Sequence, residues 1–183
     1  MMNPRVLETE RLILREWHLE DFEDFAAMHS DPRVMEFLAN DGKPLSRFAA
    51  WQSLTSIVGH WALRGFGLFA VIERATGEFV GRVGPWYPEG WPDFEVGWTI
   101  RSAHWGKGYA TEAARRAIDY SFTDLGRSHV VSLILPHNTR SIKVAQRLGE
   151  QFERDVELPH LPGKRVLQYG VHKHDWVSMS GAG

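Results

Sequence analysis

The chain has 183 residues, enough for one domain with a sizeable core. Its net charge of -2 gives no bulk electrostatic reason to expect nucleic acid or an anionic membrane as a partner. The absence of cysteine excludes disulfides, thiolate chemistry and cysteine-based metal sites. Neither a signal peptide nor a membrane span is visible, so we expect a cytoplasmic enzyme or binding protein.

The first third of the chain predicts one strand followed by helices. A strand is expected over residues 11–17 and a short helix over 19–30, with a further helical turn restarting at Asp31-Pro32. Ser46 is expected to cap a longer helix that ends near Gly65.

The hydrophobic period then changes from helical to extended. Ala75-Thr76-Gly77 lies between two apolar runs and predicts a hairpin. The remaining pattern predicts strands at 94–100, 129–136, 152–157 and 165–173, and helices at 110–122 and 138–149. The fold class is therefore α+β with a mixed sheet, in a single domain over 1–177 followed by a flexible tail at 178–183.

A glycine-rich turn precedes the helix at 110–122. Gly106 and Gly108 flank Lys107, so backbone N–H groups can converge on an anion at the positive end of the helix dipole. A phosphate or pyrophosphate fits this chemistry, while a simple tight turn is the alternative. A Walker loop needs Ser or Thr after the lysine, and a dinucleotide fingerprint needs Gly where Thr111 stands, so both fail.

Two segments resemble the GNAT superfamily of N-acetyltransferases. "WGKGYA" (105–110) resembles the acyl-CoA-binding motif, with Trp105 where the family has Gln or Arg, and Asn138 and Ser141 match the later Asn-x-x-Ser. "LETERLILREW" and "DPRVMEFL" look like the RimJ/RimL subgroup, which acetylates protein N-terminal amines. The resemblance covers about residues 7–169. It implies a mostly antiparallel central sheet with helices on both faces.

The resemblance also implies where acetyl-CoA binds. The amides of the turn hold the pyrophosphate, and the pantetheine arm pairs with the strand at 98–100. A bulge near Gly97 is expected to direct a backbone N–H of the Val96–Trp98 stretch at the thioester oxygen, although a packing glycine explains Gly97 equally well. The expected cofactor-binding residues are Trp98, Thr99, Ile100, Trp105, Gly106, Lys107, Gly108, Tyr109, Ala110, Thr111, Asn138 and Ser141.

Proton transfer needs a base and an acid. Glu95 is the expected base, because a Glu in this strand plays that role in several relatives. The alternative is that Glu95 is an ordinary carboxylate on the solvent-facing side of the strand. Asp93 and Glu89 are weaker candidates for the base. Many relatives use a Tyr seven residues after the Asn to protonate the leaving thiolate. Ala145 stands there, so Ser141 is the expected acid.

The acceptor is a primary amine, either a protein N-terminus or a small molecule, and Trp86, Tyr87 and Trp91 suggest an aromatic wall for it. A non-catalytic acyl-CoA-binding module and a nucleotide-binding domain are the competing interpretations. No metal site is expected, since His172-x-His174 is more typical of a surface. Relatives are often homodimers.

Overall fold

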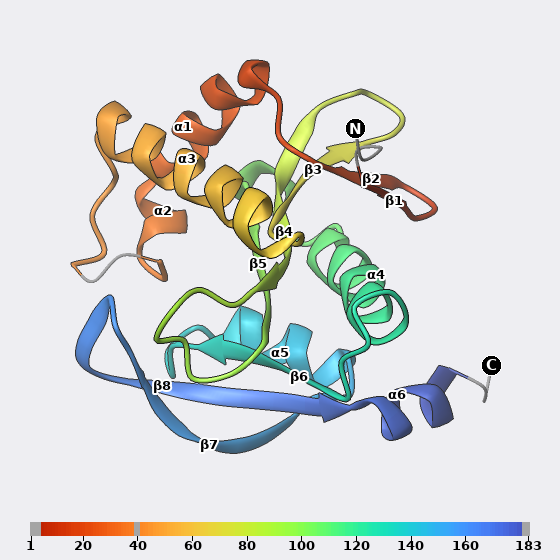
Figure 1. Cartoon of the computed structure of the whole chain (residues 1–183). Coiled ribbons are helices and arrows are strands. Elements are labelled where there is room, and N and C mark those ends of the chain that lie inside the picture. The colour runs from red at the N-terminus through yellow and green to blue at the C-terminus, as the bar shows by residue number, and fades with distance from the viewer. Residues whose placement is uncertain (1–4, 39–40, 181–183) are drawn as a thin grey trace.

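The computed structural model describes residues 5–38 and 41–180, and the side chains of all of these except 177–180. Eight strands form one sheet in the order β1-β2-β3-β4-β5-β6-β8-β7, in which only the β5–β6 neighbours are parallel (Figure 1). The strands are β1 (Val6–Glu8), β2 (Leu12–Arg15), β3 (Phe69–Glu73), β4 (Phe79–Trp86), β5 (Glu95–Ile100), β6 (His129–Ile134), β7 (Gln151–Leu158) and β8 (Leu161–His172). The helices are α1 (Phe22–Ser30), α2 (Pro32–Met35), α3 (Arg47–Arg64), α4 (Tyr109–Thr123), α5 (Thr139–Arg147) and α6 (Lys173–Ser180), with short 3-10 turns at Leu19–Asp21 and Ser102–His104. The predicted fold class is confirmed.

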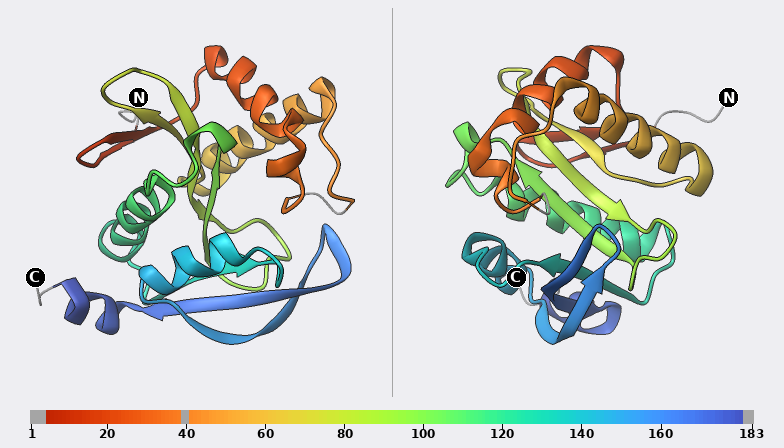
Figure 2. Two further views of the ribbon diagram at one scale, coloured as in Figure 1. Left: turned by 180° about the vertical axis from the view of Figure 1, so that it is seen from behind. Right: turned by 90° about the vertical axis from the view of Figure 1, so that its left-hand side faces the viewer.

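Helices α1 to α3 cover one face of the sheet (Figure 2). The predicted cap of α3 is confirmed, since Ser46 Oγ accepts a hydrogen bond of 3.2 Å from the Ala49 amide. The helix ends at Gly65, whose φ of 75° places it in the left-handed region that favours glycine. A buried cluster that includes Phe25, Leu54 and Ala70 joins this layer to the sheet.

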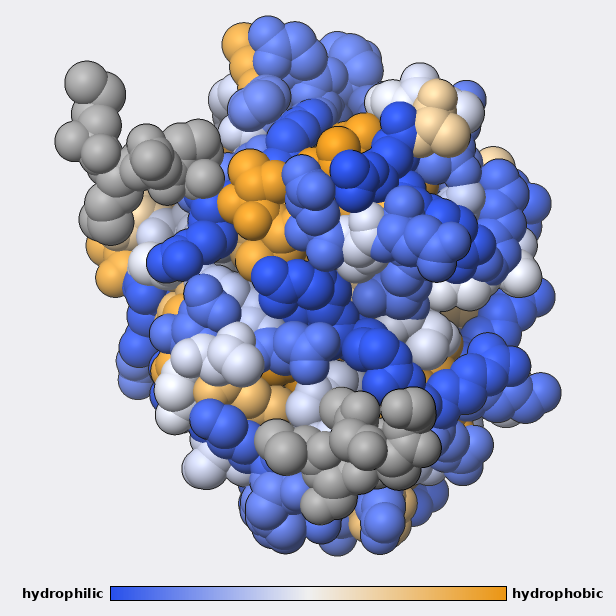
Figure 3. Space-filling model, turned by 90° about the vertical axis from the view of Figure 1, so that its right-hand side faces the viewer, coloured by the Kyte–Doolittle hydropathy of each residue, from blue (hydrophilic) through white to orange (hydrophobic). Residues whose placement is uncertain are grey.

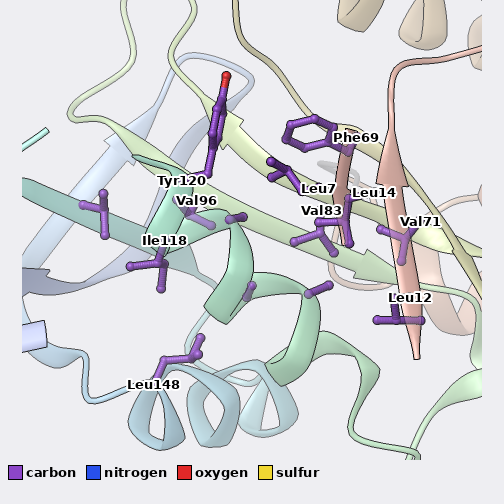
Figure 4. Close-up of a cluster of buried hydrophobic side chains, with 14 of the residues drawn as sticks. Leu7, Leu12, Leu14, Phe69, Val71, Val83, Val96, Ile118, Tyr120 and Leu148 are labelled. Carbon is purple, nitrogen blue, oxygen red and sulfur yellow. The ribbon is translucent and has the colours of Figure 1, made fainter. Parts of the chain in front are cut away.

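Helix α4 lies on the opposite face. Its alanines (Ala113, Ala114, Ala117) are fully buried, and the small side chains let the helix axis lie close to the sheet. The main core lies between α4 and strands β1 to β6 (Figure 4).

Two elements were not predicted from the sequence. Strand β1 pairs with β2 in an N-terminal hairpin. Helix α6 follows β8 directly and extends to Ser180, so it overlaps the segment for which a flexible tail was expected. Residues 181–183 lie outside the described part of the chain.

The sheet opens between β5 and β6. Glu95 and Val131 are the one residue pair that these parallel strands share, and beyond it the two halves of the sheet diverge (Figure 1). The predicted glycine-rich turn lies at the start of α4, and α5 follows β6, so both helices begin close to this opening.

Candidate acyl-CoA and acceptor site

The turn before α4 is left-handed at both of its glycines. Gly106 has φ 81°, and Gly108, which caps α4, has φ 83°. Side chains other than glycine rarely adopt this conformation. The sequence therefore places glycine at both positions where the turn needs it, and the first amides of α4 are left without side-chain caps.

The N-terminal hairpin anchors this turn. Arg11 donates from Nε to Glu112 Oε2 at 2.7 Å and from Nη1 to the Lys107 carbonyl at 3.0 Å. Thr9 Oγ1 donates to Glu112 Oε1 at 2.6 Å. These contacts leave Glu112 only partly exposed. The turn is thus fixed in position by the protein itself.

A cavity of about 560 Å³ extends from this turn along α5. All of the expected cofactor-binding residues line it except Lys107, whose side chain is exposed beside His104. Three exposed basic residues of α5, Arg140, Lys143 and Arg147, line the same cavity. These three residues were not among the predicted site residues, although their spacing of three and four places them on one face of a helix. Together with the α4 amides, they suit a ligand that carries several phosphates.

Strand β5 has no register shift against β4, so the bulge expected near Gly97 is wrong. Gly97 instead pairs with Gly84 of β4. The Arg101 amide bonds to Val80 of β4, and backbone groups alternate along a strand, so the N–H groups of Trp98 and Ile100 face the opening beyond the Glu95–Val131 pair. The open edge arises from the divergence of β6.

Helix α5 presents the second motif at this edge. Asn138 Oδ1 accepts from the Ser141 amide at 3.1 Å, which makes Asn138 the N-cap of α5. Trp98 Nε1 lies 3.2 Å from Ser141 Oγ and donates to it. Because the indole occupies an acceptor position, the hydroxyl hydrogen of Ser141 remains available to a ligand.

A second cavity of about 570 Å³ lies between the sheet and α1 to α3. It shares six residues with the first: Phe37, Leu38, Trp98, Thr99, Asn138 and Ser141. The two cavities therefore meet at the opening of the sheet, with Ser141 at the junction.

Two of the three predicted aromatic wall residues line the second cavity. Trp86 stacks on His60 with ring centroids 4.4 Å apart, and Trp91 stacks on His160 at 5.2 Å. Tyr87 does not line it: alternation along the chain turns this ring toward Phe94 in the main core, 6.1 Å away.

Glu95 lies on the floor of the second cavity, and Trp91 Nε1 donates to its Oε2 at 2.7 Å. Burial raises the pKa of Glu95 to about 7, against the hydrogen bond from Trp91 and the positive charge of Arg82, which lower it. Asp93 and Glu89 do not line this cavity; Asp93 faces His129 at 3.6 Å, and Glu89 is exposed.

Arg82 and His29 line the second cavity and were missed by the sequence analysis. The Nε atom of Arg82 is buried and has no hydrogen-bond partner among the described residues, and burial lowers the Arg82 pKa to about 10. His29 Nδ1 lies 2.8 Å from the Phe25 carbonyl and must donate to it. Burial lowers the His29 pKa to about 3, so this imidazole is neutral near pH 7.

A buried carboxyl group was also missed. Ser132 Oγ lies 3.0 Å from the Val96 carbonyl and 3.0 Å from Glu150 Oε1. A hydroxyl has one hydrogen, so both contacts are satisfied when a protonated Glu150 donates to Ser132, which donates to Val96. Burial raises the pKa of Glu150 well above its usual value, in agreement with that arrangement.

His172 has two neighbours that the sequence did not predict. Its side chain, that of His129 and that of Glu153 offer atoms within 4.8 Å of one another, and His129 Nε2 bonds to Glu153 Oε1 at 2.7 Å. His129 and His172 are also cross-strand partners whose rings stack. The hydrogen bond and the stacking account for this cluster.

The surface beside the hairpin, α4 and α6 is mostly hydrophilic, interrupted by small apolar groups (Figure 3). None of the helices among the described residues has the length and apolar character needed to cross a membrane.

Comparisons with known proteins agree with this geometry. Residues 11–151 match the acetyltransferase (GNAT) domain family. The chain is 33% identical over 156 residues to the uncharacterized N-acetyltransferase p20 of Bacillus licheniformis, an alignment that covers 82% of this chain and 86% of that protein. It is 31% identical to the uncharacterized protein YkkB of Bacillus subtilis, over 82% of this chain and 87% of that one.

Solved structures share the fold. An acetyltransferase from Agrobacterium tumefaciens superposes with a TM-score of 0.81 at 28% identity, covering 94% of this chain and 97% of that one. RimJ of Mycobacterium smegmatis, in complex with CoA-disulfide, gives a TM-score of 0.76 at 17% identity over 98% of each chain, a likeness in fold alone. The chain therefore belongs to the GNAT family and is an acetyl-CoA-dependent acyltransferase.

Proposed function

We propose that the protein transfers the acetyl group of acetyl-CoA to a primary amine by direct attack while both substrates are bound. The observation that carries this proposal is the junction of the two cavities at the open edge of β5, with Ser141 at the junction and Glu95 on the acceptor side. A phosphate-bearing ligand and an amine can reach this junction from opposite sides.

The residues around the first cavity suit coenzyme A. The N–H groups of the turn from Gly106 to Thr111 face an anion, and the basic residues of α5 add positive charge. The exposed edge at Trp98 and Ile100 offers main-chain partners to the pantetheine arm. When bound there, acetyl-CoA supplies an activated acyl thioester, and a backbone N–H of this edge polarises its carbonyl.

Glu95 is the proposed general base, because a carboxylate with a pKa near 7 can accept a proton from an ammonium group and still be ionised at neutral pH. Ser141 is the proposed acid for the leaving thiolate, since its hydroxyl hydrogen is available at the junction. The acceptor amine contacts Trp86 and Trp91, which line the cavity beside Glu95.

The acceptor is a small amine or a protein N-terminus. Supporting the second, the RimJ/RimL-like segments 7–17 and 31–38 are present in the sequence. The structural neighbours that act on ribosomal proteins by their titles are 20% identical to this chain and share its fold.

Calorimetry with coenzyme A and a thiol-release assay with a panel of amines test the proposal. We expect coenzyme A to bind and at least one amine to be acetylated. Binding without turnover on any amine would instead favour the non-catalytic module, and the absence of binding would refute both interpretations.

A further inference from the structure

The acceptor cavity contains a guanidinium group for which the protein provides no close partner. Of the described residues that line the cavity, Arg82 and Glu95 are the ones with an Arg, Lys, Asp or Glu side chain. Glu95 acts on Arg82 electrostatically, but Arg82 Nε makes no hydrogen bond to the described part of the chain. A guanidinium held in such a setting favours an anion with two acceptor oxygens.

The sheet places these two groups at opposite ends of one trough. Arg82 pairs with Thr99 across the β4–β5 ladder, and Glu95 pairs with Trp86, so both side chains project from the same face. The two pairs are four residues apart, which is roughly 13 Å along the strands before the side chains reach toward each other. The Glu95 carboxyl group reaches over Gly97 toward Arg82, so the two charged groups are closer than this, and a short acceptor can contact both.

The residues between the two ends on this face are glycines. Gly84 and Gly97 form the intermediate pair and add no side chains, and the Glu95 carboxyl group lies over Gly97, 3.1 Å from where a Cβ would stand. Gly97 lines the cavity, whereas Gly84 does not, because the Gly67 carbonyl covers it, 2.7 Å from where a Cβ would stand. Trp86 and Trp91 stand beside the trough and offer apolar contact to a short spacer.

His29 leaves the positive charge of Arg82 unchanged. His29 also lines the cavity and carries no charge near pH 7, so it does not neutralise or reinforce Arg82. Once Glu95 has taken a proton from the amine, the charged groups of the cavity reduce to Arg82 alone. An anionic group on the acceptor would restore the balance of charge.

We propose that the acceptor is an amine that carries an anionic group, a carboxylate or a phosphonate-like group, and that Arg82 binds this anion while the amine lies at Glu95. The inference rests on the proposed acetyl transfer and names its substrate class. It makes Arg82 a specificity-determining residue, and it disfavours polyamines, whose second cation would face the guanidinium.

Matched acceptors test the proposal. Aminocarboxylates with two to five methylene groups between the amine and the carboxylate are compared with the corresponding carboxamides and aminoalkylphosphonates, and rates are expressed per free amine. We expect kcat/KM of the native protein to be about tenfold to 100-fold higher for an anionic acceptor than for its carboxamide. The ratio between carboxylate and phosphonate then distinguishes the two anions.

Arg82→Gln should remove that preference by lowering kcat/KM for the anionic acceptors. Because Arg82 also lowers the Glu95 pKa, the two proteins are compared at about pH 9, where Glu95 stays ionised, and the carboxamides should then remain within about threefold of the native value. Arg82→Lys should restore part of the preference, since the charge returns without the paired geometry. Arg154→Gln, an exposed residue of β7 that lines neither cavity, is the matched control and should change nothing.

A binding measurement separates this inference from the proposed function. In the presence of coenzyme A, an anionic acceptor should raise the melting temperature of the native protein and of Arg154→Gln, but not of Arg82→Gln. If every amine fails to react, acetyl transfer is refuted, while the binding measurement still tests Arg82. Equal use of carboxamides and anionic acceptors, or an equal loss for both in Arg82→Gln, would overturn the inference and leave Arg82 as a counter-charge to Glu95.

Discussion

Glu95→Gln tests the proposed chemistry most directly. A base with a pKa of about 7 is about one-eleventh ionised at pH 6 and about ten-elevenths ionised at pH 8. The native kcat/KM, expressed per free amine, should therefore rise about tenfold between these two values. Glutamine keeps the shape of the side chain and removes the base, so we expect a loss of about 100-fold to 10,000-fold and no step near pH 7.

The thiol-release assay gives both profiles, and calorimetry with acetyl-CoA should show unchanged affinity. Trp91→Phe provides an internal check, because the lost indole N–H stabilises the ionised form of Glu95. The rise should move upward by about one pH unit in that variant. A step near pH 7 that persists in Glu95→Gln, or a native profile that rises near pH 4.5, would refute the assignment of the base.

Three further changes probe the rest of the site. Ser141→Ala should lower kcat with little change in acetyl-CoA affinity, and an unchanged kcat would remove Ser141 as the acid. Gly108→Val should abolish coenzyme A binding in calorimetry while circular dichroism shows the fold retained; Gly126→Val, at another exposed left-handed glycine (φ 65°), should bind normally. The Glu150 pKa is higher in the folded protein than in the unfolded chain, so the unfolded chain loses this proton at lower pH. The free energy of unfolding of the native protein should therefore fall as pH rises above about 4.5, by about 1.4 kcal/mol in total for each unit by which the pKa is raised. Glu150→Gln should therefore raise the melting temperature more at pH 8 than at pH 5, and an equal change at both would contradict this.

Local features of the sequence predicted the turn before α4 and the start of α5 well. The glycines of the turn and the cap at Asn138 depend on neighbouring residues, so a short stretch of sequence carries their signal. The bulge predicted at Gly97 was wrong, because a glycine in the middle of a strand is compatible both with a bulge and with the close approach of another group. The register with Gly84, which distinguishes the two, depends on β4 and β5 together.

The acceptor side depends on contacts between distant segments. Arg82 lies among apolar residues of β4, and Glu150 lies among other charged residues of the sequence. In neither case does the sequence state which cavity or neighbour the side chain meets. Tyr87 was open to better prediction, since it directly follows Trp86, the last residue of β4, and consecutive residues of extended chain point to opposite faces.

The sheet is continuous across β5 and β6 at one residue pair, so it consists of a five-stranded and a three-stranded part that share a narrow neck. A pantetheine arm along the exposed edge would provide the main-chain partners that the neck lacks. Since such a ligand favours the assembled parts, the amide hydrogens of Trp98 and Ile100 should exchange more slowly with solvent when coenzyme A is bound. The donor substrate would then take the place of a neighbouring strand at the unpaired edge of β5. Its concentration would affect how firmly the two parts of the sheet are held together as well as the rate of turnover.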